Sequence, residues 1–305
     1  MVSTSTSAAR SGGHGERPFA SYAARVHNGG VKRPSGAVLA ALAVLGGGVA
    51  LATAADRFAT AVPEPNPERS AFSFVRVRYD SVGGYNEAFY DYDGRLWQRW
   101  ETDHPQADEN FAHRLEELTA IRTNPRSVTR RLTDPDLFSF PLLYLCDVGW
   151  MTLSRQEVEA LREYLLRGGF LWADDFWGQG EWRNFEGIMR RVLPDVAWRE
   201  IPPAHPILHT LFELEELPQI PARDFAEMGL RHDPAEYHRP PAIGLERASL
   251  RGFFDASGRL LAVATYNTDI GDGWEREAYG QWFFERYSTV AYAAGANIVL
   301  YALTE

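Results

Sequence analysis

The ten residues 168–177, Gly-Gly-Phe-Leu-Trp-Ala-Asp-Asp-Phe-Trp, constrain the fold more than any other stretch of the chain. A glycine pair of this kind ends a helix, and the apolar run after it is typical of a buried strand. Asp174 and Asp175 directly follow that strand. In an open α/β sheet, ligands bind in the crevice beyond the carboxyl ends of the strands. We therefore expect both carboxylates to lie where a ligand would bind.

The helix before these glycines has a clear beginning. Ser154 with Glu157 forms a capping box, and Leu153 with Val158 forms a hydrophobic staple. The other patterns predict strands at about 72–79, 128–132, 141–147 and 196–201, helices at about 108–121, 184–192 and 287–303, a loop at 202–241, and a hairpin of 243–254 with 259–266. Strands alternating with helices predict a mostly parallel sheet covered on both faces, which is a three-layer α/β sandwich.

The chain divides into four predicted regions. Residues 1–33 are rich in Ser, Gly, Ala and Arg and are predicted to be a disordered extension, and 34–55 are uncharged and apolar up to their end. That apolar run is either a secretory signal peptide or a transmembrane anchor. In both cases the rest of the chain would be exported to the periplasmic side. As an anchor, the segment would also hold the exported part at the membrane. A Pro-rich linker at 56–69 leads to one α/β domain at 70–305.

The charge of the chain excludes one class of partner. The formal net charge is -10 and the folded part lacks a basic stripe, so we expect no nucleic-acid partner. Neither a P-loop nor a Gly-x-Gly-x-x-Gly fingerprint is present, so we expect no nucleotide. The lone cysteine, Cys146, lies in an apolar run and is predicted to be a buried, inert thiol.

Acidic residues gather at the predicted ends of three strands. They are Asp147, the pair Asp174 and Asp175, and the group Asp269, Asp272 and Glu275, which follows the neutral candidate Asn267. If these groups meet, their oxygens would suit a hard divalent cation, Mg²⁺ or Ca²⁺, with Asp174, Asp175 and Asp269 as the first candidates for ligands. The alternative is that the aspartates cap helices and loops through backbone N–H groups, with no cofactor.

Histidine and tryptophan supply the other candidates. His205 is a candidate acid or metal ligand, and the alternative is a loop histidine bonded to the backbone, because Pro206 disfavours a helix there. Trp150 and Trp177 follow strand ends, where they could bind a flat ligand such as a sugar or a peptide. The alternative is that these large aromatic side chains only cover the end of the sheet.

Several strings resemble one bacterial family. They are 102–111 (Thr-Asp-His-Pro-Gln-Ala-Asp-Glu-Asn-Phe), 165–175, 205–209 (His-Pro-Ile-Leu-His), 267–275 and 296–304. Together they resemble the DUF4159 family. The resemblance implies a flavodoxin-like fold of the class I glutamine amidotransferase type. It also implies an exported part of a membrane protein, with MoxR-type ATPases and von Willebrand A-type proteins as neighbours, and it brings no established activity.

The amidotransferase comparison also makes a negative prediction. Those enzymes carry a nucleophilic cysteine in a Gly-x-Cys-x-Gly elbow. Here Tyr144 and Val148 stand where the glycines would be, so cysteine-dependent glutamine hydrolysis is not expected at Cys146.

Three functions remain open from the sequence. The first is binding of a ligand or partner at the acidic and aromatic edge of the sheet. The second is metal-dependent hydrolysis of a cell-envelope polymer, with Asp174 and Asp175 as ligands or general base and His205 as acid. The third is a structural subunit of a cell-envelope complex.

Overall fold

The computed structural model of the chain describes residues 71–84, 87–92, 94–222, 226 and 247–305. The predicted extension (1–33), apolar segment (34–55) and linker (56–69) lie outside these residues, as does the part of the predicted loop and hairpin at 227–246. Among the described helices, none has the length and apolar character needed to span a bilayer.

The described residues form a central sheet of seven strands. In order across the sheet they are β5 (Val128–Arg130), β1 (Val75–Val77), β6 (Leu142–Cys146), β8 (Phe170–Asp174), β11 (Leu260–Tyr266), β10 (Ser249–Phe254) and β9 (Trp198–Glu200). The first five are parallel, β10 is antiparallel to β11, and β9 is antiparallel to β10. The parallel strands therefore follow the 2-1-3-4-5 order of one class of doubly wound sheet. The predicted mostly parallel sheet is confirmed.

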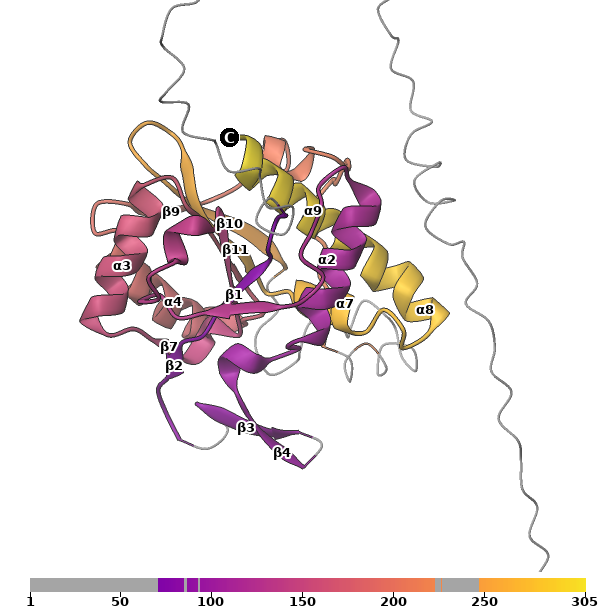
Figure 1. Cartoon of the computed structure of the whole chain (residues 1–305), viewed down its shortest axis with the longest axis horizontal. Coiled ribbons are helices and arrows are strands. Elements are labelled where there is room, and N and C mark those ends of the chain that lie inside the picture. Colours follow the sequence, from indigo (N-terminus) through magenta and orange to yellow (C-terminus); the bar gives the residue numbers. More distant parts are fainter. Residues whose placement is uncertain (1–70, 85–86, 93, 223–225, 227–246) are drawn as a thin grey trace, which may run out of the picture. The chain divides into compact units, whose positions relative to one another are not determined.

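Helices cover both faces of this sheet (Figure 1). On one face lie α3 (Arg155–Leu166) and α4 (Gly178–Val192), and on the other lie α2 (Gln106–Leu118), α7 (Ile270–Glu275) and α9 (Thr289–Thr304). The predicted three-layer α/β sandwich is therefore confirmed. Because both faces are covered, every residue of β6 and β8 is buried, which explains their continuous apolar runs.

Strands β6 and β8 end at the same level of the sheet. Their register pairs Leu142 with Phe170 and Cys146 with Asp174. The loops that follow Cys146 and Asp174 therefore begin side by side at the carboxyl edge. This pairing brings residues about thirty positions apart in the sequence into one site.

The helix between these two strands begins as predicted. The Ser154 hydroxyl accepts a hydrogen bond from the backbone N–H of Glu157 (3.2 Å), and the Glu157 carboxylate accepts one from the backbone N–H of Ser154 (2.9 Å). The helix ends before Gly168, whose φ of 107° only glycine adopts easily. The capping box and the glycine stop are both confirmed.

Two helices differ from the prediction. Helix α4 begins at Gly178 and not at 184, because Trp182, Phe185 and Met189 give its first turns a continuous buried face. The stretch after β11, for which no element was predicted, contains the short helix α7 with Asp269 as its cap. Both differences add helical structure directly after a strand end.

Two small strand pairs lie beside the carboxyl edge and were not predicted. Strand β3 (Phe89–Tyr92) pairs with β4 (Arg95–Gln98), and β2 (Asp80–Ser81) pairs with β7 (Met151–Thr152). Figure 1 shows all four at the same end of the domain. The pairing of β2 with β7 joins the segment after β1 to the segment after β6.

Candidate functional site

Four non-glycine residues of the described chain have a positive φ, and all four belong to one region. Asp147, Asp175 and Asn267 directly follow β6, β8 and β11, and Asp103 lies three residues before α2. Their φ angles are between 54° and 63°. Left-handed backbone at such residues is uncommon and concentrates at functional sites. The carboxyl edge is therefore the first candidate for a site.

Asp174 faces inward and is fully buried. Its Oδ2 accepts hydrogen bonds from the Tyr144 hydroxyl (2.9 Å) and the Gly271 N–H (3.0 Å), and its Oδ1 accepts one from the Thr265 hydroxyl (2.5 Å). Burial raises the pKa of Asp174 to about 6, against the opposing effect of these hydrogen bonds. The carboxylate thus ties β6, β11 and α7 together beneath the edge.

Asp175 lies on the other side of the strand end and has fewer donors. Its Oδ1 accepts a hydrogen bond from the Trp177 indole (3.0 Å), and the Cys146 thiol lies 3.9 Å from its Oδ2. Burial, and next the charge of Asp147, raise the pKa of Asp175. Burial likewise raises the pKa of the Cys146 thiol, which agrees with the predicted inert thiol.

Asp147 is compensated by an arginine. Its Oδ2 accepts hydrogen bonds from the Arg99 guanidinium (2.9 Å) and the Thr102 hydroxyl (3.2 Å). Burial still raises the pKa of Asp147 to about 6. Arg99 also bonds the backbone carbonyl of Glu87 (2.7 Å), so this ion pair connects the β3–β4 strand pair to the end of β6.

The polar residues after β11 make different contacts. Asp269 caps α7 through a hydrogen bond to its Oδ1 from the backbone N–H of Asp272 (2.7 Å), as the capping alternative predicted. Asp272 and Glu275 lie 3.2 and 2.6 Å from the Arg276 Nε. Asn267 accepts a hydrogen bond from the Gly178 N–H (2.9 Å) and so joins the end of β11 to the beginning of α4.

The structure adds Asp103, which the sequence analysis did not single out. In the described chain, its carboxylate groups with those of Asp272 and Glu275, and also with Cys146 and Asp175, with the nearest ligand atoms of each group within 4.8 Å of one another. The predicted set of Asp174, Asp175 and Asp269 is not one of these groups. Asp103 lies outside every predicted element. The sequence feature that could have pointed to it is the Asp-His-Pro string just before α2.

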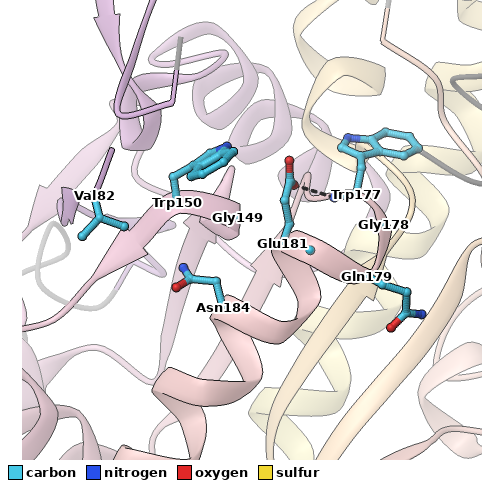
Figure 2. Close-up of a pocket in the computed structure, with 9 residues that line it drawn as sticks. Val82, Gly149, Trp150, Trp177, Gly178, Gln179, Glu181 and Asn184 are labelled. Carbon is cyan, nitrogen blue, oxygen red and sulfur yellow. Dashed lines mark hydrogen bonds between the residues drawn. The ribbon is translucent and has the colours of Figure 1, made fainter. Parts of the chain in front are cut away.

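A pocket of about 450 Å³ lies on the same edge (Figure 2). It is lined by Val82, Gly149, Trp150, Trp177, Gly178, Gln179, Gly180, Glu181 and Asn184. The half-buried side chains of Trp150 and Trp177 stand on either side of Glu181, as Figure 2 shows. The structure thus brings together the two tryptophans that the sequence singled out.

Glu181 is the ionisable side chain of this pocket. Its Oε2 accepts a hydrogen bond from the Trp177 N–H (2.7 Å), and burial raises its pKa to about 7. A Cβ at Gly149 would lie 2.5 Å from the Glu181 side chain, so only glycine leaves room for it. The sequence analysis missed Glu181 because it placed the start of the helix at 184.

His205 does not reach this edge. The prediction that it acts as an acid together with Asp174 and Asp175 is therefore wrong. Its ring packs near Phe254 and Tyr301. Phe254 ends β10, which is antiparallel to β11, and so marks the amino ends of the parallel strands. His205 Nδ1 accepts a hydrogen bond from the Ile207 N–H (3.3 Å), as the loop-histidine alternative predicted.

The fold and the site define an α/β sandwich with an acidic, aromatic carboxyl edge. The family described as "Domain of unknown function (DUF4159)" matches residues 74–303, and the chain belongs to this family. The comparison with curated proteins found no match. The family confirms the resemblance seen in the sequence and leaves the function to be argued from the site.

Proposed function

We propose that this domain binds a saccharide in the pocket between Trp150 and Trp177. The supporting observation is the pocket itself, in which two half-buried indoles flank Glu181, and which Gln179 and Asn184 also line. Binding pockets combine apolar and aromatic walls with a few convergent polar groups. A sugar ring offers both surfaces, since it carries C–H groups on its faces and hydroxyls around its rim.

The charges of the edge favour a neutral or cationic ligand. Glu181 lies in the pocket, and Asp147 and Asp175 lie two residues before lining residues of the same two loops. A phosphate or nucleotide would meet these carboxylates without a matching row of basic side chains. If the predicted export segment at 34–55 acts as expected, the saccharide would be part of a cell-envelope polymer.

Binding can be measured by titrating purified full-length protein with neutral oligosaccharides, such as oligomers of β-1,4-linked N-acetylglucosamine, while following tryptophan fluorescence and heat. We expect Trp150→Ala and Trp177→Ala each to weaken binding about tenfold, which corresponds to about 1.4 kcal/mol. Trp282→Ala is the matched control, because Trp282 is half-buried in the short helix α8 (Gln281–Phe283) and does not line the pocket. Binding that survives removal of both pocket tryptophans would contradict the proposal.

Hydrolysis of the bound saccharide is a second candidate, supported by Glu181. A carboxyl with a pKa of about 7 is well matched to general acid catalysis near neutral pH. The hydrolase alternative then uses Glu181 in place of His205. Release of reducing ends should disappear in Glu181→Gln while binding of the oligosaccharide remains. Absence of any release by the wild-type protein would leave binding as the function.

A further inference from the structure

Asp103 presents a buried oxygen that the described protein does not satisfy. Its Oδ2 is buried and has no hydrogen-bond partner among the described residues. The backbone around it is firmly held, since Arg76 donates a hydrogen bond to the Thr102 carbonyl (2.6 Å) and the Ala107 N–H donates one to the Asp103 carbonyl (2.9 Å). A buried, unpartnered acceptor costs free energy. Oδ2 of Asp103 therefore lies beside a well-held backbone without a hydrogen-bond donor from the described residues.

The neighbours of this oxygen are other carboxylates. Oxygens of Asp103, Asp272 and Glu275 lie within 4.8 Å of one another. Burial, and then the charges of Asp272, Glu275 and Asp175, raise the pKa of Asp103. Arg276 contacts Asp272 and Glu275, at 3.2 and 2.6 Å. One guanidinium therefore faces two of the three carboxylates.

The backbone keeps the space beside these oxygens open. A Cβ at Gly271 would lie 2.9 Å from Asp103 Oδ2 and 3.5 Å from Asp269 Oδ1. A side chain at this position would thus press on the Asp103 carboxylate and on the Tyr144 hydroxyl, which lies 3.1 Å from the same point. The glycine and the unsatisfied oxygen are separate observations that indicate the same small, negatively charged space.

We propose that Asp103, Asp272 and Glu275 bind a hard divalent cation of the Ca²⁺ or Mg²⁺ kind. Two oxygens that each lie about 2.3–2.6 Å from Ca²⁺ can be about 5 Å apart, so the observed spacing suits a shared ion without backbone movement. All donors are oxygens, as these cations prefer. Glu275 retains 19% exposure of its side chain, which gives an ion a route from solvent.

This site is distinct from the saccharide pocket. None of Asp103, Asp272 and Glu275 lines that pocket. The site joins distant parts of the chain, since Asp103 belongs to the segment between β1 and β5, and Asp272 and Glu275 belong to α7 after β11. Cation binding and saccharide binding can therefore fail independently, and separate titrations distinguish them.

The test is calorimetric titration of the purified full-length protein with CaCl₂ and, separately, MgCl₂, with melting temperatures measured in EDTA and in each salt. The wild-type protein should release or absorb heat and should melt at a higher temperature with the preferred cation. In Asp103→Asn, the Kd should rise at least tenfold and the cation-induced shift should disappear. In EDTA the same variant should melt at or above the wild-type temperature, because asparagine tolerates the positive φ of this residue and its amide can donate to the neighbouring carboxylates.

If Asp103 had a purely structural role, the Asp103→Asn variant would melt at a lower temperature in both buffers and would bind the cation as the wild type does. That result would overturn the proposal. So would a wild-type protein that shows neither heat nor a shift with millimolar cation. Glu275→Gln is the second variant if Asp103→Asn does not fold, and it too should weaken binding at least tenfold. Asp195→Asn is the matched control, because Asp195 is exposed in the turn before β9.

Discussion

Two sets of buried carboxylates lie within this domain, and they differ in what faces them. Asp108 and Asp174 are each met by donors, namely the Arg76 guanidinium in the first case and two hydroxyls and a backbone N–H in the second. Asp103 and Asp175 face mainly other acids, which raise their pKa after the effect of burial. The first set is paired with donors of the protein itself and stabilises the fold. The second set has few donors of its own, which is the arrangement expected where a ligand or cation binds.

The difference follows from where each residue lies. Asp108 is inside α2 and Asp174 ends β8, so both have regular backbone around them. Asp103 and Asp175 have positive φ angles in the loops beyond these elements. The carboxylates of Asp108 and Asp174 meet donors from packed elements of the fold. Those of Asp103 and Asp175 lie in loops at the carboxyl edge, where fewer donors reach them. Substitutions in the two sets should therefore have different effects.

The largest expected effect is at Asp108. Arg76 bonds both of its carboxylate oxygens, at 2.6 to 3.0 Å, and both side chains are fully buried. Asp108→Asn should lower the free energy of unfolding by about 3–5 kcal/mol, because it leaves a buried guanidinium without its counter-charge. Urea denaturation measures this loss. Asp136→Asn, in the exposed pair with Arg130, should cost less than about 1 kcal/mol, and equal losses would contradict the argument.

The adjacent pair Asp174 and Asp175 gives the sharpest comparison. Asp174→Asn should cost about 2 kcal/mol, because the amide cannot accept every hydrogen bond that the carboxylate accepts. Asp175→Asn should change stability by less than about 0.5 kcal/mol or increase it, since asparagine tolerates a positive φ and the charge beside Asp147 is removed. Both are measured by urea denaturation at pH 8. A larger loss at Asp175 than at Asp174 would reverse the assignment of the two sets.

Glu181 predicts a pH dependence. Its pKa is about 7 in the folded protein and would be near its ordinary value of 4.5 in the unfolded chain. The folded state thus binds more protons between these values, and stability falls as pH rises from 4.5 through 7. Glu181→Gln should remove this slope. The variant should be more stable than the wild type by up to about 2 kcal/mol at pH 8, after allowance for partial exposure, and should match it at pH 4.

Melting temperatures of the two proteins from pH 4 to 8 measure this difference. Parallel pH profiles for the wild type and Glu181→Gln would show that another group causes the slope. Asp147, whose pKa is raised to about 6, is the nearest alternative, and Asp147→Asn separates the two contributions.

The smallest effect on binding is expected at His205. His205→Ala removes the acceptor for the Ile207 N–H and should cost about 0.5–1 kcal/mol. Saccharide and cation binding should both stay within twofold of the wild type, because His205 lies at the amino ends of the parallel strands. Fluorescence and calorimetric titrations check this. A tenfold loss of either binding would restore His205 to the site and contradict the placement.

Much of the scaffold was predictable because it depends on local patterns. The capping box at Ser154 and Glu157, the glycine stop at Gly168 and the apolar runs of β6 and β8 all act over a few residues. The candidate site was predictable in part for the same reason. Trp150 and Trp177 follow strand ends in the sequence, and parallel strands bring such ends to one edge.

The sequence by itself determined the α/β sandwich, its family and the edge at which acidic and aromatic residues gather. Hydrophobic periodicity, helix caps and strand ends all depend on residues that are close together in the sequence. Only the tertiary structure decided which acids meet. The pairing of β6 with β8 and the position of α7 turned Asp174 inward to Tyr144 and brought Asp103 to Asp272. Such contacts depend on side-chain direction across distant elements, and no local pattern encodes that direction.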